Sequence, residues 1–244
     1  MADQFERSRM LLGDRGMERL RRSAVAVFGI GGVGSFAAEA LVRSGIGRMA
    51  FIDNDDVSLS NLNRQLIATY ETLGQKKVEA MAQRAHSIRP DMEIETYPLF
   101  YNEETADSLD LSRYDYVVDA IDTVSSKLLL ILRARQAGTP IISSMGTGNK
   151  LDPARLEIAD IYETSVCPLA RVMRRELKRR GVESLTVVYS REQPAVPDRE
   201  QAGGPALGPD GLPLRKQPPG STAFVPSAAG LMIASKIVRE ICGR

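Results

Sequence analysis

The glycine-rich turn within residues 25–41 is the feature that most constrains the fold of this chain. An unbroken apolar run of strand length precedes the turn, and small and apolar residues follow it at helical spacing. Gly29, Gly31 and Gly34 fit the pattern G-x-G-x-x-G, and Gly32 adds a fourth glycine. Glycines allow a tight turn and a close approach of backbone to phosphate, and the next helix presents free N–H groups there. We therefore predict that this turn is a nucleotide-binding site. The alternative is a tight turn with a structural role only.

Strand and helix patterns alternate along the rest of the chain. Strands are predicted at residues 25–28, 48–53, 92–99, 114–122, 140–144, 156–161 and 185–189. Helices are predicted after the glycine turn and at residues 75–87, 127–137, 168–180 and 226–242. This alternation favours an α/β fold, a Rossmann-like and mostly parallel sheet flanked by helices, with ligands at the carboxyl ends of the strands.

Two segments fall outside this alternation. Residues 5–22 carry apolar side chains among many arginines, which predicts an N-terminal arm of one or two short amphipathic helices. Such an arm must lie on the domain or on a partner. Residues 192–220 are rich in proline and glycine, which predicts a long mobile loop and not a second domain. The whole chain, 1–244, is therefore predicted to form one domain.

Composition narrows the class of protein further. Lys plus Arg number 32 and Asp plus Glu 31, so overall charge neither favours nor excludes nucleic-acid binding. Cys167 and Cys242 lie far apart, which argues against a disulfide framework or a four-cysteine zinc site and favours a reducing cytoplasm. The N-terminus lacks an apolar signal segment, and the late apolar stretch 223–237 is too short to span a bilayer. We expect a soluble, cytoplasmic protein.

The second predicted strand ends in an acid, Asp53, about 20 residues beyond the glycine turn, where nucleotide-binding βαβ units place a carboxylate for the ribose hydroxyls. The alternative is a turn carboxylate within residues 53–56. Arg64 and Lys77 bracket the approach to the next helix, where they could grip a triphosphate. Asp122, after the fourth strand, would face the same crevice and could hold Mg²⁺. Together these charges would stabilise a leaving pyrophosphate, although each cation alone is more often part of a surface salt bridge.

Several motifs together make the sequence similar to the ubiquitin-activating-enzyme-like adenylyltransferases. The resemblance covers residues 5–165 and a closing segment at 219–234. The motifs that carry it are Gly29-Ile30-Gly31-Gly32-Val33-Gly34-Ser35, Ile52-Asp53-Asn54-Asp55-Asp56-Val57, Ser60-Asn61-Leu62-Asn63-Arg64-Gln65, Lys77 and Asp119-Ala120-Ile121-Asp122. Asn149-Lys150-Leu151-Asp152-Pro153 and Cys167-Pro168-Leu169-Ala170-Arg171 resemble most the branch that dehydrates threonylcarbamoyladenosine in tRNA.

The resemblance implies adenylation of a carboxylate with ATP and Mg²⁺. The nucleotide-binding set that it implies is Gly29, Gly31, Gly32, Gly34, Asp53, Asp55, Asn61, Arg64, Lys77 and Asp122. Within that set Asp53 would bind ribose, Asn61 would position the triphosphate, and Asp122 would hold the metal. Arg64, Lys77 and Asp122 would also be catalytic, together with Arg7. Arg7 resembles an arginine that relatives insert into the neighbouring subunit's site, which implies a homodimer; a solvated arm residue is the alternative.

Departures from the superfamily pattern narrow the expected chemistry. The chain lacks the two Cys-x-x-Cys pairs that relatives acting on sulfur carriers usually have, and Cys167 is its one candidate for a thioester. A buried inert cysteine is the favoured interpretation of Cys167. The resemblance then implies that the threonyl carboxylate of the modified adenosine attacks the α-phosphorus of ATP. The neighbouring carbamoyl group would close onto the acyl-adenylate and expel AMP.

The sequence leaves alternatives and partners open. The chain could instead activate the C-terminus of a small ubiquitin-like or sulfur-carrier protein, act as a nicotinamide-dependent oxidoreductase, or bind nucleotide without turnover. Its expected partner is tRNA, for which the basic stretch 171–180 offers phosphate contacts, although a solvated helix face is the commoner role. A cysteine desulfurase or sulfur-acceptor protein is an open candidate partner. Loop 192–220 could cover the site or serve only as a linker.

Overall fold

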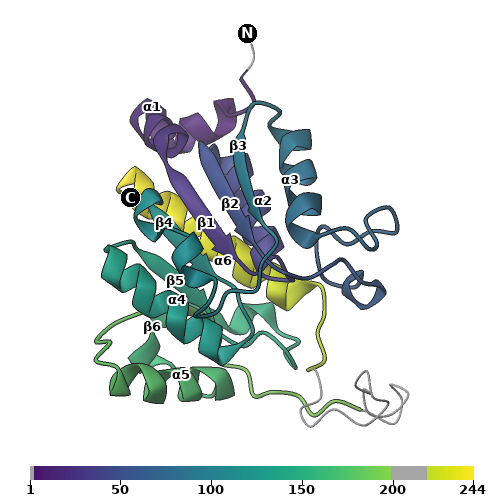
Figure 1. Cartoon of the computed structure of the whole chain (residues 1–244), viewed down its shortest axis with the longest axis vertical. Helices are drawn as coiled ribbons and strands as arrows, with labels where there is room; N and C mark the ends of the chain where they lie inside the picture. The colour runs from purple at the N-terminus through teal and green to yellow at the C-terminus, as the bar shows by residue number, and fades with distance from the viewer. Residues whose placement is uncertain (1–2, 199–218) are drawn as a thin grey trace.

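The chain folds around a seven-stranded sheet with helices on both faces (Figure 1). The computed structural model describes residues 3–198 and 219–244. The strands are β1 (Ala24–Phe28), β2 (Arg48–Ile52), β3 (Glu93–Tyr97), β4 (Tyr116–Asp119), β5 (Ile141–Ser144), β6 (Leu156–Asp160) and β7 (Thr186–Ser190). The α-helices are α1 (Glu6–Arg22), α2 (Gly34–Ser44), α3 (Lys77–Ile88), α4 (Val124–Ala137), α5 (Pro168–Arg179) and α6 (Phe224–Cys242).

The strand order places a crevice at the centre of the sheet. The order is β3-β2-β1-β4-β5-β7-β6, and every pair is parallel except β6 with β7. From β1 the chain connects to β2, which lies on one side of β1, whereas β4 lies on the other side of β1. The connections between strands therefore reverse direction between β1 and β4. Phe28 pairs with both Ile52 and Asp119, so three strands end at one level. A parallel α/β sheet binds its ligands outside such carboxyl ends, and the predicted Rossmann-like architecture is confirmed.

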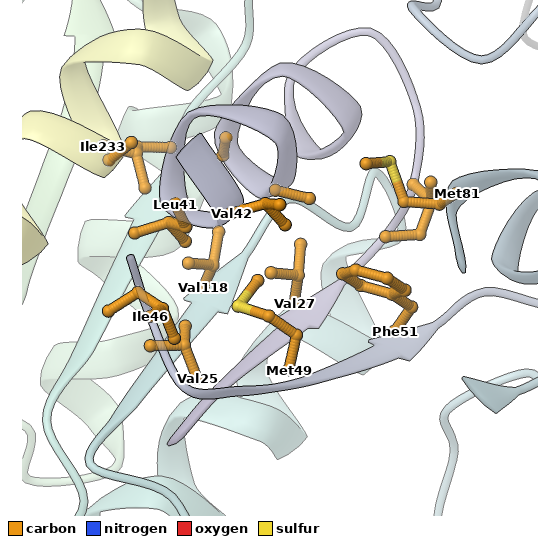
Figure 2. Close-up of a cluster of buried hydrophobic side chains, with 14 of the residues drawn as sticks. Val25, Val27, Leu41, Val42, Ile46, Met49, Phe51, Met81, Val118 and Ile233 are labelled. Atoms are coloured by element: carbon orange, nitrogen blue, oxygen red, sulfur yellow. The ribbon is translucent and has the colours of Figure 1, made fainter. Parts of the chain in front are cut away.

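Both faces of the central strands are buried, as the continuous apolar runs predict for a parallel sheet. Val25, Val27, Met49 and Phe51 point to one face, where they pack with α2, α3 and α6 (Figure 2). The intervening residues of the same strands point to the other face, where α4 and the segment 97–114 cover them. A further apolar cluster joins α4 to α5. The site loops are therefore mounted on a rigid core.

Most element boundaries match the predictions within a few residues, and the differences have local causes. The fourth strand ends at Asp119 and not at 122, because the Asp119 carboxylate takes the N–H of Ile121 (3.2 Å) and turns the chain. Helix α4 consequently begins at Val124, earlier than predicted. Helix α1 is kinked at Gly13 (φ 71°, ψ 168°), so the arm consists of two helical parts. Of loop 192–220, residues 199–218 lie outside the described part.

Among the described residues, no helix has the length and apolarity that a membrane crossing requires.

Candidate active site

The glycine turn is shaped by two glycines that nothing larger could replace. Gly29 has a φ of 88°, and a Cβ there would lie 2.6 Å from the carbonyl oxygen of Ala120 at the end of β4. A Cβ on Gly34 would lie 1.8 Å from the Gly29 carbonyl oxygen. Gly31 is different, because the nearest atom to its missing Cβ is the Gln65 Nε2 at 3.8 Å. Gly29 and Gly34 therefore close the turn, while Gly31 leaves it open for a ligand.

The open side of this turn carries unused donors. Within the described residues, no hydrogen bond occupies the backbone N–H of Gly31, Gly32 or Val33. These groups lie at the amino end of α2, where the helix dipole adds positive potential. Free N–H groups at a helix N-terminus form an anion site, and the geometry is suited to phosphate.

Asp53 holds the turn against β2. Its Oδ2 accepts the N–H of Ile30 (2.6 Å), and its Oδ1 accepts the N–H of Asp55 (2.9 Å). Burial raises the pKa of Asp53, and the charge of Lys77 with these backbone donors only partly offsets that effect. Each carboxylate oxygen keeps a second lone pair, so a ribose hydroxyl could still be bound.

Lys77 is a nearly buried cation at the first position of α3. Its side chain is 7% exposed, and its Nζ lies 2.7 Å from Asp55 Oδ2. The backbone fixes this pair as well, because the Lys77 N–H donates to the Asp55 carbonyl (3.0 Å). The structure thus brings Asp53, Asp55 and Lys77 together at one edge of the sheet.

The loop 58–65 carries Asn61 and Arg64 beside the glycine turn. The Asn61 Oδ1 accepts the N–H of Ser58 (3.0 Å), so this buried side chain braces the loop from within. Arg64 packs its stem on the turn, since its Cγ lies 3.6 Å from the missing Cβ of Gly32. Its guanidinium donates to the Ser60 carbonyl (2.7 Å) and Asn63 Oδ1 (2.9 Å), and it has no carboxylate partner among the described residues.

Asp122 lies exposed beyond β4, and Thr123 Oγ1 lies 3.3 Å from its Oδ1. Ala120, two residues earlier, touches the glycine turn, so Asp122 follows the same edge of the sheet. In residues 3–198 and 219–244, no group of three or more His, Cys, Asp or Glu side chains could hold a metal by itself. A cation at Asp122 would therefore need oxygens from the nucleotide, which is the usual environment of Mg²⁺.

Sequence reasoning missed a buried ion pair beneath this edge. The Lys127 Nζ lies 3.0 Å from Asp119 Oδ2, and both side chains are fully buried. The same Nζ donates to the carbonyls of Ile121 (3.0 Å) and Ser144 (2.8 Å). Lys127 thereby fixes the backbone that leads into Asp122. The available signal was that Lys127 directly precedes an apolar run on a predicted helix. A lysine buried with such a run requires a charged or polar partner.

Sequence reasoning also missed a tether at Asn149, which lies in the loop after β5. Asn149 has a positive φ of 57°. Its N–H donates to the Gly220 carbonyl and its Oδ1 accepts the Gly220 N–H, both at 2.7 Å. The next residue, Ser221, accepts a bond from Asn63 Nδ2 (3.0 Å). The loop after β5 is thus joined to the loop that carries Arg64.

Arg7 is not brought to this site within its own chain. It lies exposed on α1. Helix α1 packs at the opposite end of the sheet from the glycine turn (Figure 1). Phe5 and Arg21, at the two ends of α1, lie against Gly45 and Gly47 in the turn before β2. Cys167 is also away from the glycine turn, 2% exposed and packed in the cluster between α4 and α5.

A mostly parallel α/β domain with an open glycine turn, a buried lysine and an exposed acid at the carboxyl edge defines a nucleotide-binding protein. The chain belongs to the ThiF family, whose sequence model matches residues 5–244. It is 44% identical to the tRNA threonylcarbamoyladenosine dehydratase of Bacillus subtilis, over 99% of this chain and 95% of that protein. The predicted resemblance is thereby confirmed.

Solved structures and a second kind of relative complete the comparison. The structure matches Escherichia coli tRNA N6-threonylcarbamoyladenosine dehydratase in complex with ATP, with a TM-score of 0.86 and 29% identity, over 98% of this chain and 94% of that one. A sulfur carrier protein adenylyltransferase of Thermus thermophilus is 35% identical, over 57% of this chain and 52% of that protein.

Proposed function

We propose that this chain uses ATP to dehydrate threonylcarbamoyladenosine in tRNA through an acyl-adenylate. The observation that carries the proposal is the open glycine turn, with unused N–H groups beside the buried Lys77. It occurs in a chain that is similar over its whole length to a Bacillus enzyme named for this reaction. The predicted function and enzyme class are confirmed by this relative and by the ATP-bound Escherichia coli structure.

The residue roles follow from charge and position. The triphosphate would lie over the amino end of α2, with Asp53 toward the ribose and Asn61 holding the loop that borders it. Lys77 and Arg64 would neutralise the phosphates, and the preorganised cations would stabilise the charge that develops on pyrophosphate as it leaves. Asp122 would hold Mg²⁺, which supplies further charge neutralisation on the phosphates. These roles and the metal are proposals that the arrangement at the sheet edge supports.

The substrate's own groups complete the reaction. Its threonyl carboxylate attacks the α-phosphorus, an O–P bond forms, and pyrophosphate leaves. The neighbouring carbamoyl group then attacks the activated carbonyl, and AMP leaves with one of the original carboxylate oxygens. Proximity within one substrate provides the second nucleophile, so no thiol is required of Cys167.

A homodimer would give the N-terminal arm its role. Arg7 lies too far from its own glycine turn, while Met10 and Leu11 on the same helix are 76% and 74% exposed. An exposed apolar pair on a basic helix favours contact with a partner. We infer that α1 carries Arg7 to the site of a second copy.

Helix α5 supplies a surface for tRNA phosphates. Glu176 binds Arg175, Arg179 and Arg180 on this helix. The side chains of Arg171 and Lys178 are exposed and make no hydrogen bond or ion pair among the described residues. The cations outnumber the single acid, which suits a phosphate backbone. A sulfur-relay partner and a cytoplasmic location stay predictions.

Pyrophosphate release separates this function from its alternatives. The full chain is incubated with ATP and Mg²⁺, and with either threonylcarbamoyladenosine-containing tRNA or a sulfur-carrier protein. Release with the modified tRNA alone supports the proposal, whereas release with the carrier alone would select carrier adenylation, which the Thermus relative favours. Release with neither, or a nicotinamide-dependent change in absorbance, would overturn the proposal.

A further inference from the structure

Gln65 presents an unused amide to the glycine turn. It follows Arg64 in the loop 58–65 and is 6% exposed. Among the described residues its Oε1 is buried with no hydrogen-bond partner. Its Nε2 donates no hydrogen bond there either. That Nε2 is the nearest atom to the missing Cβ of Gly31, at 3.8 Å. A buried side-chain amide without hydrogen-bond partners lowers the stability of the folded chain. Its position beside the free N–H groups of the glycine turn therefore points to a bound ligand as its partner.

The backbone next to Gln65 is joined to α2, the helix that follows the glycine turn. The Gln65 N–H donates to the Asn61 carbonyl (2.9 Å), and the N–H of Leu66 donates to Ser35 Oγ (3.3 Å). Ser35 Oγ in turn donates to the Gly31 carbonyl (2.7 Å). The position of the Gln65 side chain is therefore coupled to the glycine turn itself.

Its neighbour Arg64 is arranged differently. The Arg64 guanidinium is occupied by its own loop, through Ser60 and Asn63. Gln65 therefore supplies a neutral donor that is already aimed at the turn, whereas Arg64 must exchange partners before it can reach a phosphate.

We propose, resting on the ATP-dependent function given above, that Gln65 binds the nucleotide by donating its Nε2–H to a phosphate oxygen seated at Gly31. Oε1 then accepts from a water or hydroxyl that is bound together with the nucleotide. The nucleotide would thereby supply the hydrogen-bond partner that the Gln65 amide lacks among the described residues. Gln65 is a binding residue beside the N–H groups of the turn.

Two substitutions of Gln65 test this role against a matched control. Gln65→Met keeps a similar length without the amide, and Gln65→Glu places a negative charge against the phosphates. The control is Gln75→Met, because Gln75 also has an unpartnered buried Oε1 but donates its Nε2 to the Glu71 carbonyl (3.2 Å). Binding of ATP and of adenosine is measured by calorimetry, and thermal unfolding is measured without nucleotide.

The expected pattern separates ligand binding from structural support. Gln65→Met should weaken ATP binding by about tenfold or more, since a hydrogen bond to a charged group is lost, and should leave adenosine binding unchanged. Gln65→Glu should weaken ATP binding further. Without nucleotide, Gln65→Met should unfold at the same or a higher temperature, because an unsatisfied group has been removed. Gln75→Met should bind ATP like the unaltered protein.

Different results overturn different statements. ATP binding by Gln65→Met equal to that of the unaltered protein would remove Gln65 from the site and leave the proposed function standing. Equal losses for ATP and adenosine, or a lower unfolding temperature, would show a structural role in place of phosphate binding. If the unaltered protein binds no ATP, both this inference and the proposed function fail.

Discussion

Replacing Lys127 with Met should be among the most destabilising single changes outside the glycine turn. The change leaves the Asp119 carboxylate fully buried without its cation, which lies 3.0 Å away in the intact protein. It also removes the donor to two carbonyls, at Ile121 and Ser144. Removing one partner of a buried ion pair typically costs about 3–5 kcal/mol, a large fraction of the stability of an ordinary domain.

Urea unfolding, followed without nucleotide, measures this loss. A lower midpoint with an unchanged dependence on urea concentration would assign the effect to stability and not to the unfolded state. Lys236→Met is the matched control, because Lys236 pairs with Glu240 at 2.9 Å but with side chains 30% and 41% exposed. Such an exposed pair one helical turn apart contributes about 0.3–0.5 kcal/mol.

A second variant tests the stated cause. Lys127→Met combined with Asp119→Asn removes the uncompensated charge, so it should recover part of the loss. The Asn oxygen can still accept the N–H of Ile121, while its amide nitrogen can donate to the Ser143 hydroxyl, which donates to Asp119 in the intact protein. If Lys127→Met cost no more than the Lys236 control, or if the double variant were less stable than the single one, the buried-charge reasoning would be wrong.

Three further outcomes are expected. Arg64→Ala should lower turnover by about 2.7–4 kcal/mol of transition-state stabilisation, by analogy with the loss of one oxyanion donor, and unchanged turnover in a folded variant would falsify its assigned role. Arg7→Ala and Arg64→Ala proteins should each have low activity alone and regain activity when their subunits are mixed, since one site of a mixed dimer is then intact. No recovery despite subunit exchange would argue against a shared site. Burial alone would raise the pKa of Glu39, but the hydrogen bonds from Arg84 and Arg43 outweigh it and hold the pKa below its usual value. Glu39→Gln should therefore be less stable than the unaltered protein at neutral pH, and chemical unfolding should show the difference shrinking as pH falls through the lowered pKa; a difference independent of pH would contradict this assignment.

The sequence predicted the parts of the site that depend on local pattern. The glycine turn, the acid at the end of β2 and the lysine that begins α3 all lie where their chain positions require, because parallel strands of one sheet end at a common edge. Contacts between segments that are distant in the chain could not be predicted from the sequence. The hydrogen bond between Asn149 and Gly220 joins residues far apart in the chain, and no sequence pattern around either residue indicates its partner. The direction of a side chain could not be predicted from the sequence either. The Arg64 guanidinium, for example, points to the Ser60 carbonyl of its own loop.

The charges of the site are balanced before any nucleotide enters. Lys77 is too deeply buried to remain unpaired, and Asp55, whose side chain is 59% exposed, supplies its counter-charge from the solvent side. Phosphate that reaches Lys77 must join or displace that carboxylate, so part of the attraction is offset by the loss of an existing ion pair. The backbone N–H groups of Gly31, Gly32 and Val33 carry no such cost, because no hydrogen bond within the described residues occupies them. The turn therefore provides the fixed part of the phosphate site, and the cations provide the part that changes partners on binding.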